Sequence, residues 1–529
     1  MKNPAGRVLV AALILTLASL AGGYIGSGVQ ADTETTSDHL RTFSQILALV
    51  EDNYVGDTEQ GELVEGAIRG LLTELDPHSN YLDPSNFGEM RDEQRGKFYG
   101  LGIRITKRGP DKPLTIITPI DGTPADEAGL IAGDIIFKIE GEETIDLTVR
   151  EAVGRLKGEK GTKVTITVQR GDKRFPVTLA RGEIPINSLR SAFMLDDTTG
   201  LIRISNFTST TSSELDEAVT KLQAEGMQRL LLDLRGNPGG LLEQAVQVSE
   251  RFIDPGKMVV YTRGRVPGSE QDYIARDGVP RLDMPVVVLV DHSSASASEI
   301  VSGAIQDHDR GLVVGETTFG KGLVQRVIPL RDGGALAVTT AKYYTPAGRL
   351  IQRDYSDLDD YYFELREDDP TATTVAPADS ELPSEVFYTS QGRKVYGGGG
   401  ITPDYTVKAE SASVLYSRIR RENLFFDFAV RYAAQHPGLK RGFKVTDTLL
   451  EEFRAFMNEK DFEYEPLDFE ESKGDISLQL RAQISSVVWD QVEESRVLAE
   501  EDPQIQKALE VFEEAKKLAE RLGASEPKG

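Results

Sequence analysis

The sequence predicts an α/β protein with an inserted β-rich domain and helical regions at both ends. The runs "RLLLDL" and "PVVVLVD" are continuously apolar, and each is followed by a polar or glycine turn and a helix-like stretch. Strands buried on both faces of a parallel sheet have this pattern. Short β-like runs and glycines fill residues 98–182, and apolar residues at helical spacing mark both ends of the chain.

Length, net charge and residue composition exclude several classes of protein. A chain of 529 residues is too long for one hydrophobic core, so we expect several domains. Its net charge of −25 argues against nucleic-acid binding, which needs a basic face. The absence of cysteine excludes thiol nucleophiles and disulfides, and none of the five histidines lies in an H-E-x-x-H frame. We therefore expect neither a metal site nor a cofactor.

Residues 1–31, "MKNPAGRVLVAALILTLASLAGGYIGSGVQA", predict export across the cytoplasmic membrane. A short basic start precedes an apolar core and an A-x-A-like cleavage site that ends at Ala31. A retained anchor is the alternative, because the stretch from Val8 to Val29 is long enough to span a bilayer. In both cases we expect a periplasmic or membrane-anchored protein facing the envelope, with membrane contact only through this segment.

Residues 37–97 are predicted to be helical. The apolar residues of "HLRTFSQILALVEDNYV" share one helix face, and "GELVEGAIRGLLTEL" repeats the pattern. We expect these helices to serve packing or the assembly of a dimer or larger homo-oligomer.

The β-rich domain, residues 98–182, resembles a PDZ domain. Thr123–Leu130, "TPADEAGL", and Gly133–Ile136, "GDII", match the central signature of that family. The resemblance implies capture of a protein C-terminus as a strand added to a sheet edge. The loop that binds the terminal carboxylate would consist of four residues whose glycines let N–H groups converge on an anion, namely Gly100, Leu101, Gly102 and Ile103. An ordinary small β-domain is the alternative.

The α/β core is expected in residues 183–353 and 386–410, interrupted by an acidic flexible insert at 354–385. Residues 411–529 are predicted to be helical again. Their last stretch, "QIQKALEVFEEAKKLAERL", is amphipathic, which fits either docking to a partner helix or a plain surface helix.

Three segments of the core hold candidate chemistry. "DLRGNPGG", residues 233–240, follows a buried strand, and its glycines could turn backbone N–H groups toward an anion. "DHSSASASEIVSGAIQD", residues 291–307, places five serines at the start of a helix. "GETTFGKGLVQRVIPL" places Lys321 at the start of a strand, with Gln325 on the same face at period two.

Each segment also has an ordinary interpretation. Ser296 and Glu299 fit the S-x-x-E capping box, and spacing alone favours a solvated lysine at position 321. As a catalytic residue, a serine at a helix start would lie beside donor N–H groups, and a buried lysine would act as a base because burial disfavours its charge. A triad in which His292 or His308 is the base stays open from the residues alone.

These segments, in this order after a PDZ-like domain, resemble the C-terminal processing peptidases, which are Ser-Lys endopeptidases of the S41 class. The resemblance runs from about Leu40 to Val407 and includes "LDPHSNYL" and "YYTPAGRLIQ". It implies a crotonase-like core similar to the Clp protease subunit, and cleavage of peptide bonds through an acyl-enzyme.

The resemblance also implies roles for single residues. Ser296 would be the nucleophile and Lys321 the general base, while Gln325 would hydrogen-bond the lysine and fix its direction. The N–H groups of Gly239 and Ala297 would hold the oxyanion.

Two other functions compete with this one. A Ser-His-Asp hydrolase would use His292 or His308, which the resemblance makes bystanders. An inactive PDZ scaffold would have lost the serine or the lysine, and both are present. The partners expected for the favoured enzyme are protein substrates with accessible C-termini, further copies of the chain and an adaptor protein.

Overall fold

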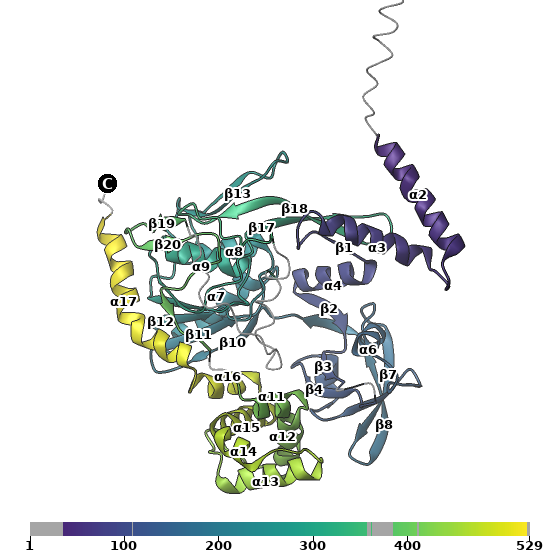
Figure 1. The fold of residues 1–529 in the computed structure, drawn as a ribbon. Coiled ribbons are helices and arrows are strands. Elements are labelled where there is room, and N and C mark those ends of the chain that lie inside the picture. Colours follow the sequence, from purple (N-terminus) through teal and green to yellow (C-terminus); the bar gives the residue numbers. More distant parts are fainter. Residues whose placement is uncertain are drawn as a thin grey trace, which may run out of the picture. The chain divides into compact units, whose positions relative to one another are not determined.

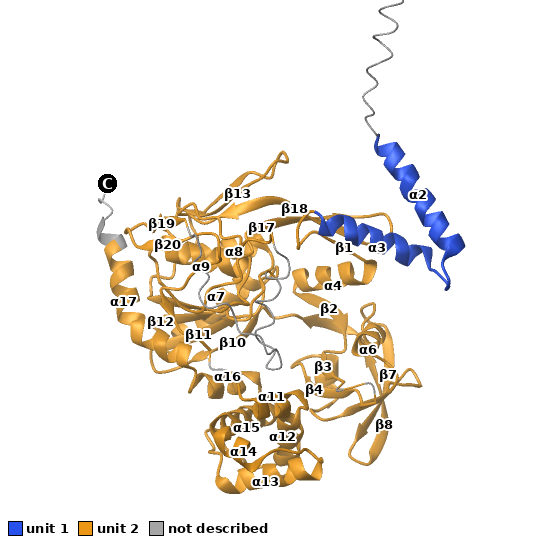
Figure 2. Ribbon diagram, viewed as in Figure 1, with its two compact units in different colours: residues 1–74 blue, residues 75–529 orange. Residues whose placement is uncertain are grey.

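The computed structural model describes residues 35–107, 109, 111–356, 361, 385–409 and 412–525. The predicted export segment, residues 1–31, lies outside the described residues, as does most of the acidic insert predicted at 354–385. The chain divides into two compact units, residues 1–74 and 75–529 (Figure 2). Within the described ranges, no helix combines the length and apolar composition needed to cross a membrane.

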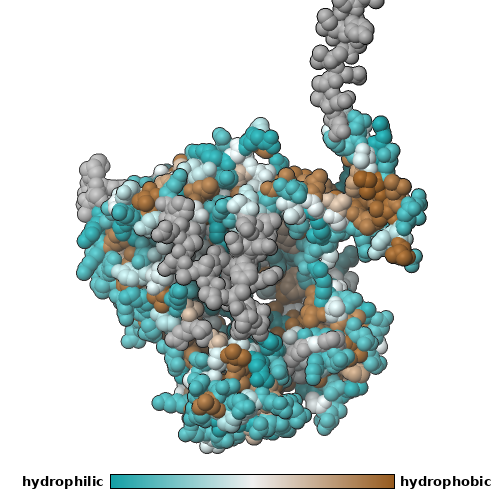
Figure 3. Space-filling view, in the orientation of Figure 1, coloured by the Kyte–Doolittle hydropathy of each residue, from teal (hydrophilic) through white to brown (hydrophobic). Residues whose placement is uncertain are grey.

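The described part of the first unit consists of α2 (Thr36–Asn53) and α3 (Gln60–Thr73) (Figure 1). No residue of α2 is buried. Its apolar side chains are exposed, with Leu40 and Leu49 each 61% exposed, and Figure 3 shows apolar residues gathered on these helices. In the single chain, α2 therefore presents an apolar stripe to solvent.

The second unit is built around a six-stranded sheet with the order β10-β11-β12-β15-β16-β21. Only β10 and β11 are antiparallel, and the other neighbours are parallel. Every residue of β15 and β16 is buried, as the continuous apolar runs predict. The strands are β10 (Leu189–Met194), β11 (Thr199–Ile204), β12 (Arg229–Asp233), β15 (Val286–Val290), β16 (Leu312–Gly315) and β21 (Tyr405–Thr406).

Helices cover both faces of this sheet (Figure 1). Leu230 and Leu232 point to one face, whereas Leu231 points to the other, because side chains alternate along a strand. The first face packs against α7 (Thr211–Ala224), α8 (Leu242–Ser249) and α9 (Ala297–Asp307). The second packs against the last helix, α17 (Pro503–Ser525), so the amphipathic tail completes the core of its own chain.

A second sheet of the core carries the segment that contains Lys321. Its longest strand, β18 (Ala335–Tyr344), pairs with β17 (Leu323–Pro329) and with β1 (Asn80–Leu82). The three-residue strand β1 lies in the region that the sequence predicted to be helical. The sheet continues from β18 through β13 (Met258–Arg263) to β14 (Gln271–Ile274), and β19 (Val386–Tyr388) and β20 (Lys394–Tyr396) form a separate two-stranded sheet.

A separate sheet forms the small β domain, in the order β3-β4-β5-β7-β8 with β6 beside β5. Helix α4 (Pro84–Arg95) and the ribbon of β2 (Lys97–Gly100) and β9 (Gly182–Pro185) join it to the core. Its elements are β3 (Ile103–Thr106), β4 (Thr115–Pro119), α5 (Pro124–Glu127), β5 (Ile135–Ile139), β6 (Glu142–Glu143), α6 (Val149–Leu156), β7 (Lys163–Arg170) and β8 (Lys173–Ala180).

The C-terminal region has a phenylalanine-rich core of its own, centred on Phe425, Phe428 and Phe453. The rings of Phe425 and Phe453 stack with centroids 5.4 Å apart. The helices are α11 (Val414–Arg421), α12 (Leu424–Gln435), α13 (Asp447–Glu459), α14 (Pro466–Glu471), α15 (Lys473–Val488) and α16 (Gln491–Ala499).

Candidate active site

The turns that follow β12 and β15 lie together at one edge of the core sheet. The two strands are parallel neighbours, so their carboxyl ends meet at that edge. A Cβ atom placed on Gly239 would lie 2.8 Å from Ser296 Cβ and 3.0 Å from the Ala297 nitrogen. The structure therefore brings the glycine turn and the serine turn into direct contact.

Three serines of the cluster have distinct surroundings. Ser294 Oγ donates a hydrogen bond to the Leu234 carbonyl at 2.9 Å, and Ser298 Oγ donates to the Asn237 carbonyl at 2.9 Å. Both of these serines are fully buried. Ser296 is half-buried, stands at the N-cap of α9 and makes no side-chain hydrogen bond that caps the helix. The flanking serines thus fasten the serine turn to the segment that follows β12.

The backbone of Ser296 is held in a conformation that side-chain-bearing residues rarely adopt, with φ 53° and ψ −109°. Such a conformation costs on the order of 1–3 kcal/mol and persists only where the surroundings impose it. The Ser296 N–H donates to Glu299 Oε2 at 2.7 Å, which is one half of the predicted capping box.

The Glu299 carboxylate also binds the lysine loop. It accepts hydrogen bonds from the N–H groups of Gly320 at 2.7 Å and Lys321 at 3.0 Å, and from Thr318 Oγ1 at 2.6 Å. Burial raises the pKa of Glu299, and these donors oppose that shift. A single buried carboxylate therefore joins the backbones of Ser296 and Lys321.

Tyr343 of β18 reinforces the same junction. Its hydroxyl donates to the Lys321 carbonyl at 2.5 Å and lies 3.1 Å from the Ser296 carbonyl oxygen. The ring is almost fully buried, and burial raises the pKa of the Tyr343 phenol well above its usual value, so it stays a donor.

Lys321 precedes β17, and its amine contacts Gln325 as the period-two spacing predicts. Lys321 Nζ donates to Gln325 Oε1 at 3.2 Å, and the structure contains no hydrogen bond from this amine to Ser296. Burial lowers the pKa of Lys321, while the negative charges of Glu299 and Asp76 oppose the shift. The amine is thus biased toward the neutral form that a general base needs.

The other end of the Gln325 amide is held by the segment that precedes β1. Gln325 Nε2 donates to the backbone carbonyl of His78. The His78 ring contacts the Tyr361 hydroxyl at 2.7 Å, and burial together with the charge of Lys321 lowers the pKa of His78 to about 4. His78 is therefore neutral at physiological pH.

Gly239 and Ala297, whose N–H groups are predicted from the sequence to hold an oxyanion, lie against each other, but the Gly239 N–H already has a partner. Gly239 has φ 104°, a value that favours glycine, and lies against Ala297. Its N–H donates to Asn237 Oδ1 at 2.9 Å. To bind an oxyanion, this N–H has to exchange the Asn237 amide for the substrate oxygen.

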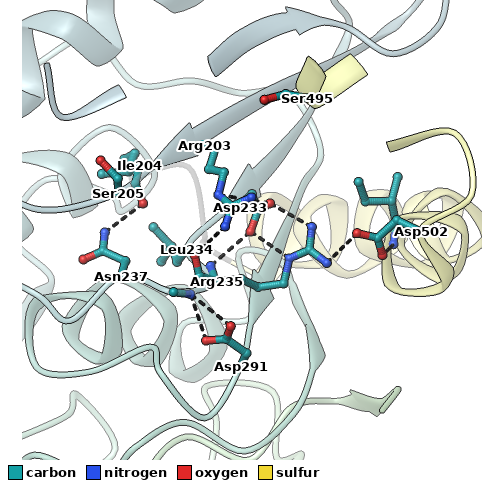
Figure 4. Close-up of polar contacts among 12 residues, drawn as sticks. Arg203, Ile204, Ser205, Asp233, Leu234, Arg235, Asn237, Asp291, Ser495 and Asp502 are labelled. Atoms are coloured by element: carbon teal, nitrogen blue, oxygen red, sulfur yellow. Dashed lines mark hydrogen bonds and ion pairs between the residues drawn. The ribbon is translucent and has the colours of Figure 1, made fainter. Parts of the chain in front are cut away.

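Arg235 links the glycine turn to the start of α17 (Figure 4). Its guanidinium binds Asp233 at 2.8 Å and Asp502 at 2.7 Å. Burial lowers the pKa of Arg235, but the two carboxylates outweigh burial and raise it overall. On the other side of the turn, Gly236 N–H donates to both carboxylate oxygens of Asp291 at 3.0 Å.

The two candidate histidines flank α9. His292 is half-buried in the turn before the helix, and its Nδ1 lies 3.9 Å from a Glu316 carboxylate oxygen. His308 lies at the far end of the 11-residue helix α9, about 18 Å along the axis from Ser296. Its Nε2 contacts the Met258 carbonyl at 2.6 Å, and burial lowers the pKa of His308.

The predicted carboxylate loop, residues 100–103, lies between β2 and β3. Gly102 has φ 78°, and a Cβ there would lie 2.3 Å from the Thr123 side chain, so only glycine fits. Leu101 is buried, and its carbonyl accepts the Ala125 N–H at 2.9 Å. Ile103 begins β3, which among the described strands pairs only with β4 and so leaves one edge open.

Three residues of this site escaped the sequence prediction. Glu299 was interpreted only as a helix cap, although the six apolar or small residues that follow it, from Ile300 to Ile305, indicate a buried helix and so a buried polar role for this carboxylate. Asp76 and His78 lie in "LDPHSNYL", which the sequence singles out only as part of a resemblance.

Family models match four parts of the chain. Residues 198–359 match peptidase family S41, and residues 115–170 match the PDZ domain. Residues 415–467 match the C-terminal helical domain of a probable PDZ-protease, and residues 25–86 match the N-terminal domain of the activating protease CtpB. The fold and the matches define a protease of family S41 that carries a PDZ domain.

Similarity to individual known proteins identifies the family within this class. It is 39% identical over 347 residues to the carboxy-terminal-processing protease of Bartonella bacilliformis, covering 63% of this chain and 79% of the relative. It is 33% identical over 348 residues to a probable CtpA-like serine protease of Staphylococcus saprophyticus, covering 65% and 69%. A solved photosystem II D1 C-terminal processing protease is 31% identical, with 58% and 89% covered and a TM-score of 0.32. The chain belongs to the carboxy-terminal processing protease family.

Proposed function

We propose that the chain hydrolyses peptide bonds with Ser296 as nucleophile and Lys321 as general base, through an acyl-enzyme. One observation carries this proposal: the half-buried Lys321 amine binds Gln325 Oε1, and the backbone N–H of Lys321 shares the Glu299 carboxylate with the N–H of Ser296. The shared carboxylate holds nucleophile and base in one rigid frame.

The steps follow from these groups. The neutral Lys321 amine takes the Ser296 hydroxyl proton while Oγ attacks the scissile carbonyl carbon. The N–H groups of Ala297 and Gly239 stabilise the oxyanion, once Gly239 has released Asn237. The lysine ammonium then gives its proton to the leaving amine, the C–N bond breaks, and a water molecule activated by the same lysine hydrolyses the ester.

We infer that the PDZ domain selects the substrate. The open edge of β3 can take an extended C-terminal segment as an added strand, and the loop from Gly100 to Ile103 can receive its carboxylate. In this arrangement residues 98–182 capture the substrate, and residues 183–353 with 386–410 cleave it.

We also propose an envelope location and self-assembly. Residues 1–31 support export, and the exposed apolar stripe of α2 supports contact between copies through the 37–97 region. The 411–529 region offers further helical surfaces to other copies or to an adaptor.

The catalytic proposal is tested with purified full-length variants and an unfolded model protein such as β-casein. Ser296→Ala and Lys321→Ala are expected to lower kcat at least about 1000-fold, whereas His292→Ala and His308→Ala keep it. Chelators are expected to leave the rate unchanged. Full activity of Lys321→Ala, with loss in a histidine variant, would instead support a Ser-His-Asp hydrolase. Mapping protein C-termini in cell envelopes with wild type and Ser296→Ala would then identify the substrates.

A further inference from the structure

The turn that precedes β1 is organised by one carboxylate. Asp76 Oδ1 accepts hydrogen bonds from the N–H groups of His78 and Ser79, both at 2.8 Å, and its Oδ2 accepts from Ser79 Oγ at 2.7 Å. An aspartate that binds the backbone two and three residues on fixes the direction of the peptide groups in between. Asp76 thus determines where the His78 carbonyl points.

The same turn is fastened to the strand beside Gln325. Thr339 N–H of β18 donates to Ser79 Oγ at 3.1 Å, and Thr339 is the register partner of Gln325. The strand β1 follows immediately and pairs with the same β18, Asn80 opposite Ala337. The Asp76 turn and Gln325 are therefore held against one point of one strand.

The two ends of the Gln325 amide are chemically different. A backbone carbonyl only accepts hydrogen bonds, so the bond to His78 requires the NH₂ group on that side and leaves Oε1 facing Lys321. With Oε1 accepting a lysine N–H, the nitrogen lone pair stays free to take a proton. A flipped amide would donate to that lone pair and occupy it.

We propose that Asp76 is a positioning residue for peptide hydrolysis: by presenting the His78 carbonyl to Gln325, it fixes which amide atom faces Lys321. The proposal rests on the catalytic role proposed for Lys321. Asp76 does not touch the reacting atoms, and its effect passes through the His78 carbonyl and Gln325.

Two conservative variants separate geometry from charge. Asp76→Asn keeps an oxygen that accepts both N–H groups but removes the charge, so kcat should stay within about threefold of wild type. Asp76→Glu keeps the charge but displaces the carboxylate by one methylene, so kcat should fall about 10- to 100-fold with KM nearly unchanged. The reverse order, with an active Glu variant and an inactive but folded Asn variant, would overturn the proposal.

A pH profile gives a readout that a purely structural role would not change. The charged groups that act on Lys321 are the carboxylates of Glu299 in α9 and Asp76 in the turn, whereas the His78 ring, with a pKa of about 4, is neutral beside them. Removing the Asp76 charge destabilises the ammonium, so the acid limb of kcat/KM in Asp76→Asn should move to lower pH while its plateau is kept. An unmoved limb would contradict contact between this turn and the lysine.

Asp83 provides the matched control. Seven residues on, it caps α4 by accepting the N–H groups of Ser85 and Asn86 at 2.9 Å, and it has no hydrogen bond to Gln325. Asp83→Glu makes the same change in the same segment and should leave kcat unchanged. Thermal melting of all variants separates loss of activity from loss of folding.

A double-mutant cycle with Gln325→Ala completes the test. If Asp76 acts through the Gln325 amide, Asp76→Glu should have no further effect on kcat in the Gln325→Ala background. An equal loss of kcat in both backgrounds would refute the positioning role of Asp76 but not the catalytic assignment of Lys321. Wild-type activity of Lys321→Ala or Gln325→Ala would refute the catalytic assignment itself, whatever the Asp76 variants do.

Discussion

Lys321 and Glu299 owe their chemistry to burial. Removal from water lowers the pKa of Lys321 although two carboxylates act in the opposite direction. Glu299 is fully buried, yet four hydrogen-bond donors from the serine turn and the lysine loop bind its carboxylate. Burial thus favours the neutral amine of Lys321, and it makes the Glu299 carboxylate a rigid connector because there is no water to exchange these donors for.

The pH dependence of the reaction follows from the lysine. Only the neutral amine accepts the Ser296 proton, so we expect kcat/KM to rise with pH along an acid limb. Because the pKa of Lys321 is lowered, this limb should lie below the usual value of 10.5. Its position is measured from initial rates on a peptide substrate, with circular dichroism at each pH to confirm folding. A limb at or above 10.5, or a rate that falls over this range, would contradict the assignment; His78, with a pKa of about 4, cannot supply it.

Among the secondary-structure elements, the sequence best predicts the strands that are buried on both faces, because nearly all their residues must be apolar. The strands β12, β15 and β16 are apolar at nearly every position because helices cover both faces of their sheet. β1 escaped prediction because it has three residues and its partner β18 lies far along the chain. The amphipathic pattern of α17 indicated a buried face, but a helical period cannot tell whether the covering surface belongs to the same chain.

The candidate site also has a part that the sequence predicts and a part that it does not. Ser296, Lys321, Gln325 and Gly239 belong to local motifs. In the structure Gly239 lies against Ser296, Lys321 binds Gln325, and the Glu299 carboxylate joins the N–H groups of Ser296 and Lys321. The role of Glu299 could not be predicted, since its local spacing already satisfies a capping box and its other donors come from a loop about twenty residues away. The bond from Gly239 to Asn237 depends on side-chain conformation, which a glycine-rich pattern does not encode.

The ion pair between α17 and the glycine turn gives a prediction at this scale. Asp502→Ala leaves the largely buried Arg235 with Asp233 and the Gln504 amide oxygen, and it removes the hydrogen bonds by which Asp502 caps α17. We therefore expect the free energy of unfolding to fall by about 1–3 kcal/mol. Urea denaturation measures this loss. Asp272→Ala is the control, because it removes a pair with Arg263 in which both side chains are exposed, and should cost less than about 1 kcal/mol. Equal losses in the two variants would show that Asp502 is an ordinary surface charge.

For the whole molecule, the last helix of the chain completes the catalytic core. The face of the sheet that α17 covers contains Leu231, Val287 and Leu289, each on a strand whose end carries the catalytic edge. Phe512 is the largest fully buried side chain of α17, and the guanidinium of Arg229, at the start of β12, lies 4.8 Å from its ring centroid. The core is therefore assembled from residues that are far apart in sequence, and the site depends on the C-terminal end of the chain.

Phe512→Ala tests this dependence. Truncating a buried phenylalanine leaves a cavity, so we expect the free energy of unfolding to fall by about 3–5 kcal/mol, and protease activity to be lost at lower temperature than in wild type. The neighbouring Glu513 is exposed, so Glu513→Ala should change stability by no more than about 0.5 kcal/mol. Chemical denaturation followed by circular dichroism, with activity measured along the same melting curve, gives both values. If Phe512→Ala were as stable as Glu513→Ala, α17 would not be packed on the sheet, and the catalytic core would have to be complete without its last helix.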